Sequence, residues 1–121
     1  MRHILATLLI LASGLALAPS LATAHSEWRG STPAEGARLA APPAEVTLRF
    51  NEAVQVTYLR LLDAAGQPFA VRRTSDAAPR REERATPEFP LPPGPWRLEW
   101  RAISADGHPI RGTLRFTVET P

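Results

Sequence analysis

Apolar and polar residues alternate in several segments of this chain, and the alternation restricts those segments to β-strands. Apolar side chains occupy every second position in residues 46–50, 96–102 and 110–118. This period of two is typical of a strand with one buried face and one hydrated face. Residues 54–62 are more evenly apolar and predict a central strand, and residues 69–73 predict a short partner to it. Helical periodicity is convincing nowhere.

Prolines and turn residues separate these segments at short intervals. The chain has 13 prolines, and segments 41–43, 76–79 and 91–95 are predicted turns or loops. The charge run RREER at residues 80–84 is interpreted as a loop rim. Short strands at such spacing predict an all-β fold, a small Greek-key β-sandwich or barrel that is immunoglobulin-like and cupredoxin-like in outline.

Residues 1–24 have the layout of a cleaved secretory signal peptide. A positive start precedes an apolar run over residues 4–18, and small residues (ATA) occupy 22–24. A membrane anchor is the competing interpretation, but the run is short for a span and Pro19 interrupts it. A lipoprotein would need a cysteine at the cleavage point, and the chain has none. We expect export to the periplasm and one domain over residues 25–121.

The composition excludes several classes of function. The formal net charge is only +2, which argues against the clustered basic face of a nucleic-acid-binding protein. All 14 basic residues are arginines, and there is no cysteine to form a disulfide. The one methionine, Met1, lies in the signal. Residues 25–121 therefore contain neither a thiolate nor a thioether.

Two histidines of the expected mature chain stand at positions suited to metal binding. His25 would be its first residue, so the free α-amine and the imidazole could chelate one ion together. Asp106 and His108 lie two apart in an extended segment, face the same side, and could meet that ion. Gly107 between them allows close backbone approach, and Pro109 favours an extended His108.

This nitrogen-rich, carboxylate-assisted set suits tetragonal copper(II). Copper(I) prefers sulfur ligands, and zinc usually needs three or four side chains in a tetrahedral set. Nickel(II) would tolerate similar ligands, although copper(II) heads the divalent affinity series. The residues alone also allow an ordinary solvated terminus at His25 and an ordinary Asp-Gly turn at Asp106.

The mature chain resembles the CopC family of periplasmic copper-binding proteins along nearly its whole length. The matching segments are 25–36 (HSEWRGSTPAEG), 46–52 (VTLRFNE), 94–112 (GPWRLEWRAISADGHPIRG) and 114–118 (LRFTV). Each segment alone is a weak signal. Their occurrence together, in this order, is specific.

The resemblance implies a Greek-key β-barrel or sandwich that holds one copper(II) ion per chain. The implied ligands are the amine and imidazole of His25 together with Asp106 and His108. The segment Phe50-Asn51-Glu52 matches the family's F-S-E, so Glu52 is expected as a weaker or outer ligand; a solvated charge at a strand end is the alternative. Some members carry a methionine-rich copper(I) site, which we expect to be absent here.

The resemblance further implies a monomeric carrier or sequestering protein for copper resistance, and an inner-membrane CopD-type transporter as its partner for delivery. Trp28 replaces the family's usual leucine and is expected to pack beneath the site, and Trp100 is expected in the core. Arg101 and Arg111 are expected at the rim and not as ligands. Two alternatives stay open, a metal-free interaction module and a histidine-brace oxidative copper enzyme. We expect no catalytic activity.

Overall fold

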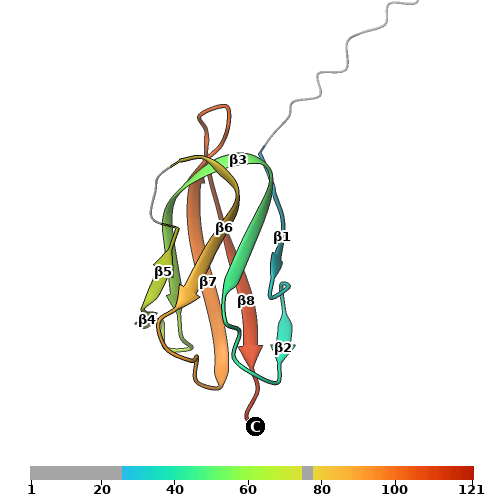
Figure 1. The fold of residues 1–121 in the computed structure, drawn as a ribbon, viewed down its shortest axis with the longest axis vertical. Helices are drawn as coiled ribbons and strands as arrows, with labels where there is room; N and C mark the ends of the chain where they lie inside the picture. The colour runs from blue at the N-terminus through green and yellow to red at the C-terminus, as the bar shows by residue number, and fades with distance from the viewer. Residues whose placement is uncertain (1–25, 75–77) are drawn as a thin grey trace, which may run out of the picture.

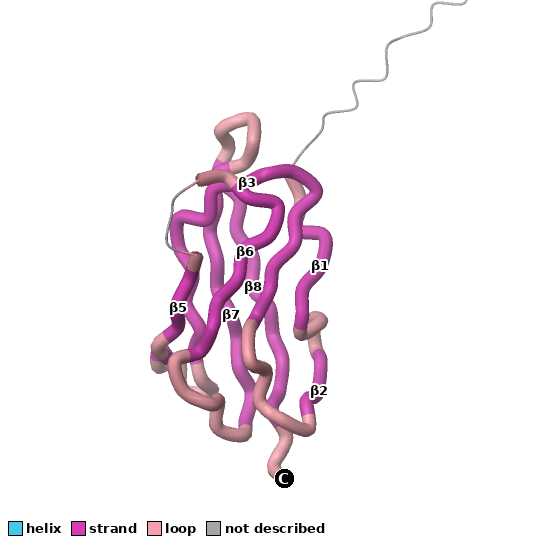
Figure 2. The backbone as a smooth tube through the Cα atoms, viewed as in Figure 1, coloured by secondary structure: helices cyan, strands magenta, loops and turns pink. Residues whose placement is uncertain are grey.

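Eight β-strands form the molecule in a computed structural model that describes residues 26–74 and 78–121. The strands are β1 (Trp28–Thr32), β2 (Ala37–Leu39), β3 (Val46–Leu62), β4 (Pro68–Phe69), β5 (Val71–Arg73), β6 (Arg80–Pro87), β7 (Gly94–Ile103) and β8 (Pro109–Val118). They curl around one another into an elongated sandwich without helices in the described ranges (Figures 1 and 2). The same ranges contain no apolar helix of membrane-spanning length. The all-β prediction is confirmed.

The long strand β3 belongs to both layers of the sandwich. Its first part, from Val46 to Phe50, pairs antiparallel with β1 and β6. Its second part, from Gln55 to Leu62, pairs antiparallel with β7, and its end pairs with β4. The register shifts between the two parts, which is how a strand can bend from one sheet into the other. The sequence predicted two separate strands here, and the structure joins them through residues 51–53.

The predicted loop rim at residues 80–84 is wrong, because this segment is part of strand β6. Only 6% of Glu83 is exposed, and its Oε1 accepts a hydrogen bond of 3.0 Å from Nε of Arg73 on the neighbouring β5. A paired carboxylate can occupy an inward position where an unpaired one would be costly. The inward positions of β6 are thus filled by the charged Glu83 and the small Ala85, which hides the alternation.

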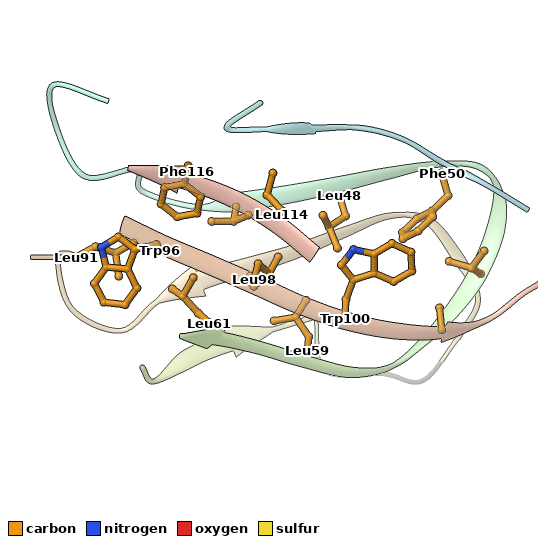
Figure 3. Packing of buried hydrophobic residues seen from close by; sticks show 14 of the residues in the cluster. Leu48, Phe50, Leu59, Leu61, Leu91, Trp96, Leu98, Trp100, Leu114 and Phe116 are labelled. Atoms are coloured by element: carbon orange, nitrogen blue, oxygen red, sulfur yellow. The ribbon is translucent and has the colours of Figure 1, made fainter. Parts of the chain in front are cut away.

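The core lies between the layers, and strand β7 crosses it with alternate side chains. Trp96, Leu98 and Trp100 are all at most 5% exposed and face the same side (Figure 3). Trp96 packs edge-on against Phe69 near one end of the sandwich. Trp100 packs edge-on against Phe50 near the other end, with ring centroids 5.1 Å apart. The two tryptophans therefore support opposite ends of the molecule.

The β7–β8 loop and the start of the described chain lie at the same end of the sandwich, and the C-terminus lies at the other (Figure 1). This placement follows from the topology, since β1 and the β7–β8 hairpin both flank β3. Residues far apart in sequence thus share one end of the molecule. That end holds three of the predicted metal-binding residues, Glu52, Asp106 and His108.

Candidate metal centre

A tight loop joins β7 to β8 and carries two of the predicted ligands. The backbone N–H of Ser104 donates to the carbonyl of His108 at 2.8 Å, and that of Gly107 donates to the carbonyl of Ser104 at 2.9 Å. Gly107 has φ of +86°, a left-handed conformation that glycine adopts without steric cost. The glycine thus allows the turn that brings Asp106 and His108 together.

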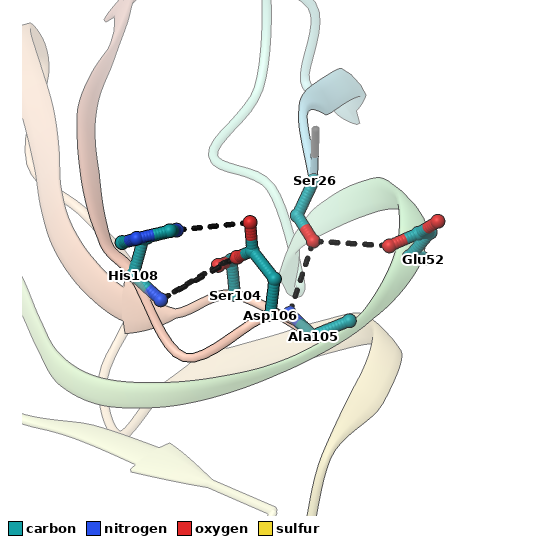
Figure 4. A network of polar contacts seen from close by, with 6 residues as sticks. All are labelled: Ser26, Glu52, Ser104, Ala105, Asp106 and His108. Atoms are coloured by element: carbon teal, nitrogen blue, oxygen red, sulfur yellow. Dashed lines mark hydrogen bonds and ion pairs between the residues drawn. The ribbon is translucent and has the colours of Figure 1, made fainter. Parts of the chain in front are cut away.

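The hydroxyl of Ser104 organises this loop from inside. Ser104 is only 7% exposed, and its Oγ donates a short hydrogen bond to Oδ1 of Asp106. The same Oγ accepts from the backbone N–H of His108 at 3.0 Å. One buried hydroxyl therefore fixes both the carboxylate and the backbone of the histidine (Figure 4).

Asp106 and His108 are in direct contact through their side chains. Oδ2 of Asp106 lies 2.9 Å from Nδ1 of His108, and their side chains are 44% and 77% exposed. A carboxylate beside Nδ1 favours the proton on that nitrogen, which leaves the lone pair of the neutral ring on Nε2. No described residue hydrogen-bonds Nε2. His108 is thus oriented as a nitrogen donor.

The loop also keeps its carboxylate ionised. The hydrogen bond from the Ser104 hydroxyl, followed by that from the His108 ring, lowers the pKa of Asp106 from 3.8 to about 2. Any loop stability that comes from these bonds is complete above the ordinary pKa and is lost as the pH falls towards about 2. At neutral pH, Asp106 is therefore an anion beside the imidazole.

The first described residue, Ser26, ties the start of the chain to this loop. It is 8% exposed, and its Oγ accepts a hydrogen bond from the backbone N–H of Ala105 at 3.1 Å. The same hydroxyl donates to Oε2 of Glu52 at 3.3 Å (Figure 4). Glu27 and Asn51 pair next to it, since each backbone N–H donates to an oxygen of the other residue. The first residues of the described chain are thus held between β3 and the β7–β8 loop.

Aromatic side chains pack beneath this polar end. The rings of Trp28 and Trp100 meet edge-on with centroids 6.2 Å apart, and Phe50 contacts the same Trp100. Nε1 of Trp28 donates to the carbonyl of Gly30 at 2.8 Å. Trp100 is 3% exposed, as expected for a core residue. Trp28 therefore packs beneath the polar end of the molecule, as expected.

The structure brings together only part of the predicted ligand set. Asp106 and His108 are in contact, and Glu52 is connected to their loop through Ser26. The prediction for His25 lies outside the described residues. Within the ranges 26–74 and 78–121, no three histidine, cysteine or acidic side chains cluster as a metal site would require.

Sequence reasoning assigned no role to Ser26 or Ser104, although both hydroxyls organise the site. For Ser104 a signal exists, because a serine two residues before an Asp-Gly turn can bond to the turn's own groups. For Ser26 no local pattern could reveal the role, since its partners lie on β3 and on the β7–β8 loop.

The fold and this loop define a small β-sandwich with candidate metal-binding side chains at one end. Comparison with protein-family models identifies the family of the chain: the model described as CopC domain matches residues 28–119. The chain belongs to the CopC family.

Individual relatives agree with this assignment. Copper resistance protein C of Pseudomonas syringae pv. tomato is 36% identical over 118 residues, covering 91% of this chain and 92% of the relative. The crystal structure of PcoC, a methionine-rich copper resistance protein from Escherichia coli, is similar with a TM-score of 0.65 and 33% identity, over 79% of this chain and 100% of PcoC. Copper transport protein CutJ of Bacillus subtilis is 30% identical over 91% of this chain but only 21% of its own length.

Proposed function

We propose that this chain is an exported copper(II)-binding protein whose site forms when a signal peptide is removed after Ala24. The ion is held by the α-amine and imidazole of His25, by Nε2 of His108 and by Asp106, with Glu52 as an outer ligand. The observation that carries the proposal is the buried Ser26 hydroxyl, which accepts a hydrogen bond from the backbone of the β7–β8 loop. Consecutive Cα atoms are about 3.8 Å apart, so a ligand one residue before Ser26 would be within reach of that loop.

The donor set supports the cupric state. Neutral imidazole and amine nitrogens with one carboxylate match copper(II), whereas copper(I) prefers sulfur. Residues 25–121 contain no cysteine and no methionine. This chain therefore differs from the relative that is named methionine-rich. We therefore propose that each chain binds a single copper(II) ion and has no copper(I) site.

Asp106 can serve the ion in either of two ways. Its contact with Nδ1 of His108 fixes the orientation and tautomer of the ring, which is the usual role of a carboxylate behind a ligand histidine. If the contact opens, a carboxylate oxygen can itself enter the coordination sphere. Glu52 is held one hydroxyl away from the loop, a distance suited to an outer ligand.

The proposed role is carriage or sequestration of copper in the periplasm by a monomeric protein, without catalysis. The relatives named for copper resistance support this role. Delivery to an inner-membrane CopD-type transporter is the proposed route of export or import. It is supported by the match of nearly all of this chain to a fifth of a longer protein that is named for copper transport.

Two measurements on the exported protein test the proposal together. Intact-mass spectrometry should give a chain that begins at His25, and copper titration followed by electron paramagnetic resonance should give one tetragonal copper(II) ion with nitrogen ligands. A chain with another first residue would lack the amine chelate. A protein that begins at His25 but ignores copper(II) at neutral pH would overturn the proposed site.

Replacing the anchoring hydroxyl should weaken copper(II) without unfolding the protein. Ser26→Ala removes the acceptor for the Ala105 N–H and the donor to Glu52, so the start of the chain is no longer tied to the loop. We expect the Kd for copper(II) to rise about 10-fold, as for loss of other groups that position metal ligands. Chelator competition measures the change. Ser31→Ala is the control, because that hydroxyl bonds to the carbonyl of Pro33 within the β1 turn; equal Kd values for the two variants would contradict the anchoring role.

The proton dependence of copper binding should be independent of Asp106. Its pKa is lowered to about 2, so between about pH 4 and about pH 7 it is already ionised and releases no proton when copper binds. Nitrogen ligands must be deprotonated to bind a metal ion, so the protons that are released come from them. The slope of log Kd against pH should therefore be the same in the wild type and in Asp106→Asn, although the variant binds more weakly. A shallower slope in the variant would show that Asp106 is protonated in the free protein.

A further inference from the structure

Several arginines lie on the outer face of the β3–β7–β8 sheet, next to the β7–β8 loop. In the strand register, Tyr58 on β3 lies beside Arg101 on β7, and Arg101 lies opposite Arg111 on β8. Arg60 is two positions along β3 and therefore on the same face. The three arginines are exposed, and buried residues such as Trp100 and Ala102 alternate with them on the inner side. Tyr58, Arg60, Arg101 and Arg111 are called the arginine face below.

The positive charge of this face is not balanced within the described chain. Arg97 and Arg115, further along the same sheet, pair with Glu99 and Glu35. By contrast, none of the three arginines of the arginine face forms an ion pair with any described residue. Glu99 lies opposite Arg60, but its carboxylate accepts from Arg97 at 3.0 Å.

The arrangement of Arg101 and Arg111 favours an external anion. Like charges directly opposite each other on neighbouring strands repel, and a carboxylate between them would replace the repulsion by attraction. The guanidinium of Arg101 lies 4.8 Å from the centroid of the Tyr58 ring, and that of Arg60 lies 5.5 Å from it. These cation–π contacts hold both side chains against the sheet. The charges are therefore presented in a preorganised row.

The surface is also hollowed at this place. A pocket of about 400 Å³ is lined by Tyr58, Arg101, Arg111 and Thr113, together with Trp100, Gly112 and Glu99. The carboxylate of Glu99 is already paired with Arg97. A carboxylate side chain fits such a depression, and the guanidinium fork can bind it through two parallel hydrogen bonds. Tyrosine and arginine are also the residue types that carry much of the energy at protein–protein contacts.

We propose that the arginine face docks an acidic segment of a partner protein, whose aspartate or glutamate side chains enter this pocket and pair with Arg101 and Arg111. A membrane surface is the less suitable partner, because peripheral binding also needs apolar side chains that enter the lipid. The large hydrophobic side chain exposed in the described ranges is Phe89, at 65%, and it lies in the β6–β7 loop. The β6–β7 loop is at the end of the molecule opposite the β7–β8 loop (Figure 1).

The arginine face lies near the β7–β8 loop, so a partner bound to it could exchange copper with this protein. Arg111 is the third residue after His108, which at about 3.3 Å per strand residue is about 10 Å from it. A partner docked there would lie next to the loop, a geometry suited to handing over copper if the proposed function holds. The docking itself needs no metal, because none of these arginines is a proposed ligand. It is therefore tested on the metal-free protein.

Binding of a short poly-L-glutamate peptide at low ionic strength, followed by NMR chemical shifts of the backbone amides, tests the inference. We expect shifts on β7 and β8 around Arg101 and Arg111, and a Kd at least about 10-fold higher for Arg101→Gln/Arg111→Gln, since each lost charged hydrogen bond is worth roughly a factor of 10. The control is Arg72→Gln/Arg81→Gln, which removes the same charge from exposed positions on β5 and β6. Circular dichroism verifies that both variants fold.

Each alternative outcome counts against the inference. An equal loss of affinity in the two double variants would mean that poly-glutamate responds only to net charge. Undetectable binding by the wild type would mean that the face takes no carboxylates. A third sample contains phosphatidylglycerol vesicles: if these bind through the arginine face more tightly than the peptide does, the partner is a membrane surface and the proposal fails.

Discussion

Acetylation of the α-amine of the exported protein should lower its copper(II) affinity by about 100-fold or more. An acetylated amine is an amide, whose nitrogen can bind a metal ion only after it loses its proton. The chelate at His25 would therefore lose one of its two nitrogen donors in ready form. The loss should exceed the 10- to 100-fold typical of groups that only orient ligands. The chain suits this experiment because it contains no lysine, and the α-amine is therefore the one primary amine of residues 25–121. Chelator competition before and after treatment with an acetylating reagent measures the effect.

Copper protection supplies the control for this experiment. If the amine is a ligand, protein loaded with copper(II) should react with the reagent much more slowly than metal-free protein does. His108→Ala should weaken binding to a comparable extent without changing the reactivity of the metal-free amine. Unchanged affinity after complete acetylation would remove the terminal chelate from the site, even if His108 still binds copper.

The central strands could be predicted from sequence because their burial repeats every second residue. Residues 96–102 and 110–118 lie within β7 and β8, and the hairpin between them carries Asp106 and His108 as expected. Strand β6 could not be predicted in this way. Its inward Glu83 is stabilised by Arg73 from another strand, a partner that sequence order does not reveal.

The site shows the same division between local and distant interactions. The Asp106–His108 contact is local, and the spacing of the two residues predicted that they lie on one side. The prediction assumed an extended segment, whereas the structure has a turn with Gly107 at φ of +86°. The attachment of Ser26 to Ala105 joins residues 79 positions apart and depends on how β1 and the β7–β8 hairpin meet at one end of β3. Such a contact follows from the complete fold. The sequence could therefore predict the candidate ligands but not the hydrogen bonds that hold Ser26 beside the β7–β8 loop.

Truncation of the tryptophan beneath the loop should strongly destabilise the protein. Trp100→Ala removes a ring that is 3% exposed and packs edge-on against Trp28 and Phe50, so it leaves a large cavity. We expect the free energy of unfolding to fall by about 3–5 kcal/mol. Trp100→Phe should cost less, because it keeps an aromatic ring and removes a buried Nε1 that has no hydrogen-bond partner in the described structure. Urea denaturation of the metal-free proteins measures both changes.

Two comparisons separate packing at the metal end from general loss of core. Trp96→Ala removes an equally buried ring at the other end, so it should cost similar stability but leave the Kd of the folded protein for copper(II) unchanged, whereas Trp100→Ala should raise it. Gly112 supplies the second comparison, because a Cβ there would lie 2.5 Å from Cζ2 of Trp100. Gly112→Ala should therefore cost about 1–3 kcal/mol in the wild type and clearly less when position 100 is phenylalanine, since the atoms that clash are then absent. Equal costs in the two backgrounds would mean that Gly112 is required for some reason other than the close approach of this ring.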